Sequence, residues 1–167
     1  MIFTVEDGTG IADATSYVDV AYAEDYLGTD WVATVEAQQD ALIRGSEYAD
    51  ARWGVRLKSV PLTSEQGLEI PRYAMFDRYG ILVEGVPNDW KKAICLYAKA
   101  QAVNGSLYPT TPTSTSKEVL GKTTKVGPIT TSVTYRDAGT AGSWLQYPLA
   151  DKLAKKFINA SAGVERN

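Results

Sequence analysis

Few side chains in this sequence are placed for chemistry, and the most suggestive of them form an acidic, glycine-rich stretch near the N-terminus. Asp7-Gly-Thr-Gly10, with Glu6 before it and Asp13 after it, offers carboxylates to a calcium ion and glycines to a phosphate group. A calcium loop also needs alternating oxygen ligands and a final bidentate glutamate, which this stretch lacks. A phosphate-binding loop needs a lysine and a second glycine at a fixed distance, and these are also missing. We therefore interpret the stretch as a tight surface turn.

The sequence contains no histidine and a single cysteine. Without histidine there is no Ser-His-Asp or Cys-His catalysis and no histidine-ligated metal. Cys95 has no partner for a disulfide and no base to activate it, so we interpret it as a small structural residue. No pair of carboxylates has a context that would raise the pKa of one of them for acid–base work. We predict no catalytic residue, no metal site and no cofactor, and expect that the protein is not an enzyme.

Length and composition are those of a globular protein. A chain of 167 residues with 44% hydrophobic and 22% charged residues fits one domain with a substantial core. No apolar run approaches the roughly 20 residues that a membrane helix needs. The N-terminus has neither the basic nor the apolar part of a signal peptide, so we expect no membrane association.

The net charge of −3 hides an uneven distribution along the chain. Residues 1–116 carry a net charge of −7, whereas residues 117–156 carry +4. An acidic body with a basic C-terminal third would attract an acidic partner or another copy of the same chain. The other interpretation, an incidental spread of solvated charge, remains open at this point.

Ten tyrosines and four tryptophans raise the possibility of base stacking on single-stranded nucleic acid. That mode of binding also needs a basic groove, and most of the aromatic residues fall at helical spacing in the acidic region, so core packing explains them better. The lysines that remain available for DNA are in the predicted hairpin and at Lys152, Lys155 and Lys156. For these we favour a solvated surface that also protects the hairpin edge from aggregation.

Three stretches of the N-terminal two thirds carry clear helix signals, and the last of them is the most apolar. Asp19 can cap a helix over 20–27, and Thr34 can cap a longer one to about Trp53. A third helix is predicted between Val86 and Gly105, with apolar residues around most of its circumference, which places it at the centre of the core. Gly45 in the middle of the second helix predicts close packing of another backbone.

The rest of the chain divides by composition. Residues 54–86 lose the helical period, residues 106–116 are a low-complexity linker, and two β-branched stretches joined at Gly127-Pro128 predict a hairpin within 117–136. Residues 137–167 contain a loop, a helix from Pro148 to Ile158 and a tail. The predicted apolar face of this helix comprises Leu149, Leu153, Phe157 and Ile158. The predicted fold is therefore mainly α: a helical body over 1–105, with a projecting β-hairpin and a C-terminal helix. A two-stranded hairpin is marginally stable by itself, so this one is expected to pack on something, such as a neighbouring subunit.

The succession of short motifs resembles a known family. The motifs are Thr4-Val-Glu-Asp-Gly-Thr-Gly10, Ser16-Tyr-Val-Asp-Val20, Ala41-Leu-Ile-Arg44, Tyr48-Ala-Asp-Ala-Arg52, Leu68-Glu-Ile-Pro-Arg72, Asp77-Arg-Tyr-Gly80, Val86-Pro-Asn-Asp-Trp-Lys-Lys-Ala93 and Val126-Gly-Pro-Ile-Thr-Thr-Ser-Val-Thr-Tyr135. In this order they resemble the head–tail connector, or adaptor, proteins of tailed double-stranded DNA phages. Members of a similar sequence group carry the label DnaT-like single-stranded-DNA-binding protein.

The resemblance implies a structural virion protein at the neck of a bacteriophage, made in the host cytoplasm. Such proteins assemble as a homo-oligomeric ring, commonly a dodecamer, between the portal protein and the tail or stopper protein, and double-stranded DNA passes through the lumen without specific binding. Contacts with these partners or with neighbouring subunits are expected in the irregular segment, the hairpin and the C-terminal region. The expected interface residues are Ile70, Pro71, Arg72, Lys122, Lys125, Arg136, Leu149, Leu153 and Phe157.

The alternative function is a DnaT-like single-stranded-DNA-binding replication protein. Charge separates the two hypotheses, because a strand-binding protein should have a basic face among its aromatic residues. In the sequence most aromatic residues lie in the region with a net charge of −7, which favours the connector.

Overall fold

The structure, a computed structural model, describes residues 2–108, 119–125, 130–135 and 146–158, and for the strands of 119–135 it describes the pairing only. The chain divides into two compact units. The first comprises Met1–Leu107 and Gln146–Asn167, and the second comprises Tyr108–Leu145. As predicted, the fold is mainly α, with helices in the first unit and a small antiparallel sheet in the second.

The helices of the first unit form where the sequence predicted them. Asp19 accepts a hydrogen bond from the Tyr22 amide at the start of α1, and Thr34 does the same for the Ala37 amide at the start of α2. Gly105 ends α3 in the left-handed conformation, at a φ of 74°. The helical elements are α1 (Val20–Leu27), the short 3₁₀ turns η1 (Thr29–Trp31) and η2 (Gly54–Arg56), α2 (Val35–Trp53), α3 (Asn88–Asn104) and α4 (Pro148–Ala154). In the described part of the chain no helix has the combination of length and apolar character that a membrane crossing requires.

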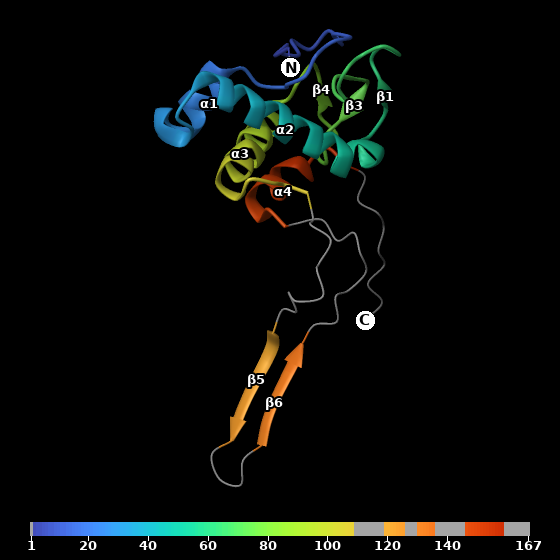
Figure 1. Cartoon of the computed structure of the whole chain (residues 1–167). Coiled ribbons are helices and arrows are strands. Elements are labelled where there is room, and N and C mark those ends of the chain that lie inside the picture. Colours follow the sequence, from blue (N-terminus) through green and yellow to red (C-terminus); the bar gives the residue numbers. More distant parts are fainter. Residues whose placement is uncertain (1, 109–118, 126–129, 136–145, 159–167) are drawn as a thin grey trace. The chain divides into compact units, whose positions relative to one another are not determined.

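The core lies between α2, α3 and α4, and Figure 1 shows α3 between the other two. The prediction for Gly45 is confirmed, because a Cβ at this position would lie 3.0 Å from the Ala98 amide nitrogen of α3. The prediction that aromatic residues at helical spacing form the core is confirmed for Tyr17, Tyr48, Trp90 and Tyr97, which are all fully buried, and is wrong for Tyr26, which is 37% exposed. Their rings meet in tilted and edge-to-face pairs, the arrangement that aromatic quadrupoles favour.

The segment between α2 and α3, expected to be irregular, contains two small antiparallel sheets. β1 (Val60–Pro61) pairs with β2 (Arg72–Tyr73), and β3 (Met75–Phe76) pairs with β4 (Leu82–Val83). Ala74 separates β2 from β3 with a φ of 48°, which bends the chain between the two sheets. Two-residue strands are too short to leave an alternating pattern, so they could not be predicted from the sequence.

The second unit contains the predicted hairpin. β5 (Val119–Lys125) and β6 (Thr130–Tyr135) are antiparallel, with Lys122 opposite Val133 and a bulge between Val119 and Gly121. Residues 109–118, which include most of the predicted linker 106–116, and residues 159–167 lie outside the described residues.

The C-terminal helix differs from its prediction in length and in its buried face. α4 ends at Ala154, and Ile158 forms an isolated β-bridge with Leu57 instead of continuing the helix. Leu149 is 60% exposed, whereas Ala150, Asp151 and Ala154 are buried. The predicted apolar face of Leu149, Leu153, Phe157 and Ile158 is therefore wrong at Leu149, because the helix turns a carboxylate inward to meet a buried arginine.

Candidate nucleic-acid interface

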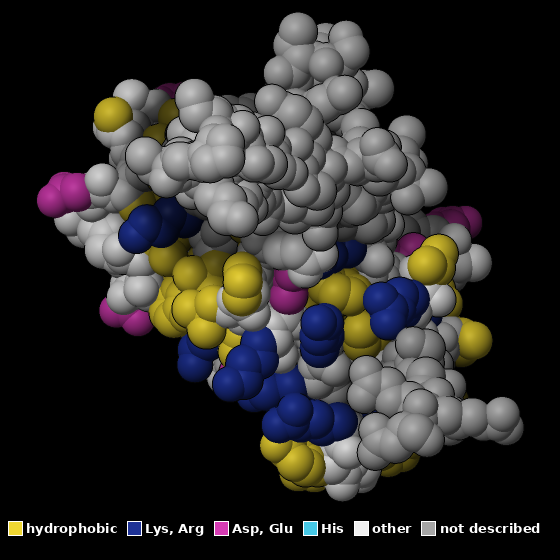
Figure 2. All heavy atoms as spheres, turned by 90° about the horizontal axis from the view of Figure 1, so that it is seen from below, with side chains coloured by type: hydrophobic (Ala, Val, Ile, Leu, Met, Phe, Trp, Pro, Cys, Tyr) yellow, Lys and Arg dark blue, Asp and Glu magenta, His cyan; other side chains and the backbone are white. Residues whose placement is uncertain are grey.

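Six lysine and arginine side chains from three separate segments meet on one surface of the first unit, which we call the basic face. Figure 2 shows lysine and arginine side chains, in dark blue, gathered on the underside of the body with apolar side chains between them. The segments are the turn after α2, the loop between β3 and β4, and α4 with the turn that follows it. The basic face comprises Arg56, Lys58, Arg78, Lys152, Lys155 and Lys156.

Backbone hydrogen bonds hold the three segments together. The Lys58 amide donates to the Phe157 carbonyl at 3.4 Å, and the Arg78 amide donates to the Lys156 carbonyl at 2.9 Å. The Lys58 ammonium group also donates to the Asp77 carbonyl at 3.1 Å. The positions of the cations are therefore determined by long-range contacts of the main chain.

Acidic groups near the basic face already have partners, and the partner of Asp89, Lys156, is itself a member of the face. Asp89 pairs with Lys156, and the Asp77 carboxylate accepts the amides of its own turn. Among the described residues, Arg56, Arg78, Lys152 and Lys155 have no carboxylate partner, and all four are exposed. A surface with several uncompensated cations attracts a polyanion.

Three of these cations line one hollow. Arg78, Lys152 and Lys155 surround a depression of about 330 Å³, together with Gln146, Pro148 and Asp151. Arginine and lysine side chains that converge in this way suit phosphate groups, because each N–H donates a charge-assisted hydrogen bond.

A buried ion pair fixes α4, the helix that carries two of the cations. The Asp151 carboxylate lies 2.8 Å from the Arg52 guanidinium, and the two side chains are only 4% and 6% exposed. The hydroxyl of Tyr97 donates to the other carboxylate oxygen at 2.7 Å, and the Trp53 indole donates to that hydroxyl at 3.0 Å. Burial raises the pKa of Tyr97 far above its ordinary value, which keeps the hydroxyl a donor. The pair orients α4 so that Lys152 faces solvent.

The structure places Ile70, Pro71 and Arg72, which were expected at an interface, inside the first unit. Ile70 and Pro71 are fully buried and present no side-chain surface to a partner. The Arg72 guanidinium pairs with Glu69 and donates to the carbonyl oxygens of Ser59 and Gly54. In this structure the three residues stabilise the fold of the irregular segment.

The remaining expected interface residues are dispersed. Leu149 is exposed, Leu153 is half-buried and Phe157 is buried against Trp90, with ring centroids 6.3 Å apart. Lys122 and Lys125 lie in β5, in the second unit. Arg136 lies outside the described residues.

In the acidic turn near the N-terminus, the backbone amides bind the carboxylate of Glu6. Glu6 is 1% exposed and accepts the amides of Gly8, Gly10 and Ile11 at 2.8 to 2.9 Å. A phosphate would need these same amides, and they are already bound to Glu6. The interpretation of the stretch as a tight turn is therefore confirmed. Within the described residues no group of three or more histidine, cysteine, aspartate or glutamate side chains is placed to hold a metal ion. Cys95 is buried, and burial raises the pKa of its thiol to about 12.

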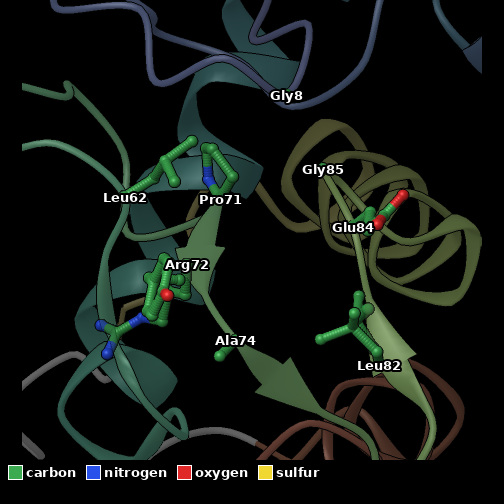
Figure 3. Close-up of a pocket in the computed structure, with 10 residues that line it drawn as sticks. Gly8, Leu62, Pro71, Arg72, Ala74, Leu82, Glu84 and Gly85 are labelled. Carbon is green, nitrogen blue, oxygen red and sulfur yellow. The ribbon is translucent and has the colours of Figure 1, made fainter.

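A second surface feature is an apolar groove beside the two small sheets. Figure 3 shows Leu62 and Pro71 on one side of it and Leu82 on the other, with the Arg72 guanidinium turned away. The groove has a volume of about 380 Å³. The same segment exposes an unusual concentration of large apolar side chains: Val60, Leu62, Tyr73, Phe76, Tyr79, Ile81 and Leu82.

Comparison with known proteins gives one family. Residues 1–167 match the family described as "Putative DnaT-like ssDNA binding protein". The chain belongs to this family. No curated protein and no solved structure matches it. The DnaT-like part of the resemblance is thereby confirmed, whereas the connector identity stays a prediction.

The interface that fits a nucleic acid was only partly visible in the sequence. Lys152, Lys155 and Lys156 were recognised as candidates, but Arg56, Lys58 and Arg78 belong to a region that is acidic in sequence. Counting charge over residues 1–116 could not find them, because carboxylates outnumber cations in that region and the sequence does not show which cations the fold brings together. Arg78 does lie in the motif Asp77-Arg-Tyr-Gly80, which the resemblance had singled out.

Proposed function

We propose that this protein binds single-stranded DNA and that the strand's phosphates lie on the basic face. The observation that carries the proposal is the convergence of Arg78, Lys152 and Lys155 on one hollow, three exposed cations without carboxylate partners among the described residues. Membership of a family described as DnaT-like ssDNA-binding proteins supports it. The acidic remainder of the chain would repel DNA and so direct it to this one surface.

Salt dependence tests the proposal. For a single strand, each phosphate contact contributes about 0.7 to the slope of log K against log salt concentration. We expect the variant Lys152→Ala/Lys155→Ala to bind a fluorescein-labelled oligothymidylate more weakly and to lower this slope by about 1.4. Fluorescence anisotropy over a series of salt concentrations measures both quantities.

A matched control removes the same charge from elsewhere. Arg44 on α2 pairs with Asp40 and Glu47, and Lys91 lies over the Tyr22 ring. The variant Arg44→Ala/Lys91→Ala should keep the wild-type slope. An equal fall of the slope in both variants would mean that binding depends only on net charge, and it would count against the basic face. Absence of binding by the wild-type protein would exclude the proposed function.

A second candidate function, the head–tail connector, is favoured by a different observation. The apolar groove and the exposed side chains between Val60 and Leu82 form the kind of surface that protein partners cover. On this alternative the protein is a virion component whose copies form a ring between portal and tail proteins, around double-stranded DNA.

Light scattering on a size-exclusion column separates the two candidates. A ring of twelve chains of 18.1 kDa is easily distinguished from a monomer. The variant Leu62→Asp/Leu82→Asp, which places charge in the groove, should prevent ring formation or portal binding. A protein that stays monomeric at all concentrations and binds no portal protein would count against the connector.

A further inference from the structure

We infer that Tyr79 is a stacking platform for one unpaired nucleobase of a strand held on the basic face. This inference rests on the proposed binding of single-stranded DNA and adds to it a site for a base. Cations alone bind phosphates of any strand, whereas an exposed aromatic ring beside them can bind a base that is free to leave its own stack.

The turn that carries Tyr79 is held rigidly. One Asp77 carboxylate oxygen accepts the Tyr79 amide at 2.8 Å and the Ile81 amide at 2.9 Å. The Asp77 amide donates to the Ile81 carbonyl at 2.9 Å, and the Gly80 amide donates to the Asp77 carbonyl at 3.2 Å. Gly80 has a φ of 80°, which a residue with a side chain would adopt only with strain. Because four hydrogen bonds fix this turn, binding a base costs little conformational entropy there.

The Tyr79 ring has one face covered by a cation and is otherwise open. The Arg78 guanidinium carbon lies 4.7 Å from the ring centroid, and the guanidinium also hydrogen-bonds to the Tyr79 hydroxyl. The residue is 66% exposed, and no aromatic ring of the described part of the chain contacts it. A cation over one face leaves the opposite face available for a base, with the three groups forming a stack.

Tyr79 directly follows a residue that lines the hollow of the basic face. Arg78, its neighbour in the chain, lines the hollow with Lys152 and Lys155 and is bonded through its amide to the Lys156 carbonyl. A nucleotide whose phosphate lies in this hollow has its base within reach of the adjacent residue. The bases of a duplex are already stacked and paired, so Tyr79 would favour a single strand over a duplex.

The test compares an oligothymidylate with an abasic strand of the same length, roughly 15 nucleotides, which keeps every phosphate and has no bases. For the wild-type protein we expect the intact strand to bind about 5- to 100-fold more tightly, the range that stacking of one base supplies. In the Tyr79→Ala variant this ratio should fall to about 1. Tyr79→Phe keeps the ring and should keep the ratio, as should Ile81→Ala, which truncates another exposed side chain of the same turn.

The outcomes distinguish this inference from the proposed function. If the wild-type protein binds both strands equally, it binds phosphates only, and the stacking site is excluded while the basic face is retained. If Tyr79→Ala keeps the wild-type ratio, the bases stack elsewhere and the assignment of Tyr79 is wrong. If the wild-type protein binds neither strand, the proposed function and the stacking site both fail.

Discussion

Replacing Asp151 with alanine should both destabilise the protein and weaken its binding to DNA. Asp151 is 4% exposed and is the carboxylate partner of Arg52, which is 6% exposed. Truncation leaves the guanidinium charge buried opposite an empty space and removes the acceptor of the Tyr97 hydroxyl. The Tyr147 amide, which donates to Asp151 at 3.2 Å ahead of α4, also loses its partner.

The magnitude follows from the cost of leaving one member of a buried ion pair alone. Such a change costs about 3–5 kcal/mol of unfolding free energy. In a chain of this size each kcal/mol lowers the melting temperature by about 2–4 °C, so a fall of about 6–20 °C is expected. DNA affinity should fall as well, because Lys152 lies on α4, Lys155 directly follows it, and the helix is fixed through Asp151.

Circular dichroism at increasing temperature measures the change in stability, and the anisotropy titration measures binding. Lys152→Ala, an exposed neighbour on the same helix, should leave the melting temperature nearly unchanged, within about 0.5 kcal/mol, and serves as the control. The double variant Arg52→Met/Asp151→Leu removes both charges and should recover much of the lost stability. A melting temperature of Asp151→Ala within about 2 °C of wild type would refute the reasoning that the pair holds α4.

Two further predictions concern buried titratable groups. Burial raises the pKa of Asp50 from 3.8 to about 7, so the folded state holds this proton more tightly than the unfolded chain does. The resulting stabilisation is present in full below about pH 4 and is lost as the pH rises towards 7. Asp50→Asn should flatten this dependence in urea unfolding measured at several pH values, and an unchanged dependence would assign it to another group. Cys95, with a thiol pKa raised to about 12 by burial, should not react with a chromogenic disulfide reagent at about pH 8 until urea unfolds the protein. Rapid labelling of the folded chain would contradict its burial.

The partner that stabilises the hairpin would indicate which of the two candidate functions the protein has. Two strands without a further layer are marginal in water, and β5 and β6 pair only with each other in the described structure. A partner that covers them, whether a strand of DNA or another protein, would stabilise the second unit. Hydrogen exchange of residues 119–135 with and without each partner would show which one does so.

The helices of this protein could be predicted because their signals are local. Caps at Asp19 and Thr34, the left-handed Gly105 and the spacing of apolar residues act within a few residues of one another, and the structure reproduces the predicted limits of α1, α2 and α3. Even the approach of α2 to α3 was visible, because a glycine in mid-helix is unfavourable without such a contact.

The candidate site could not be predicted in the same way. Its cations come from three segments of the chain, and one of them, the loop between β3 and β4, is neutral when read along the chain because Asp77 precedes Arg78. The carboxylates that mask them in sequence are used in the structure: Asp77 closes its own turn and Asp89 pairs with Lys156. The carboxylates of Asp77 and Asp89 are therefore not available to neutralise the remaining cations, which the fold brings onto one face.

The sequence by itself determined the helices, the hairpin and the family, because periodicity, capping and motif order are properties of neighbouring residues. Only the tertiary structure decided which face of α4 is buried, since Asp151 turns inward to meet Arg52, a residue 99 positions away. It also decided that Ile70 and Pro71 are inside the molecule and that Arg78 lies beside Lys152 and Lys155. The physical reason is the same in each case: burial and electrostatic pairing depend on distances in space, which the order of residues does not contain.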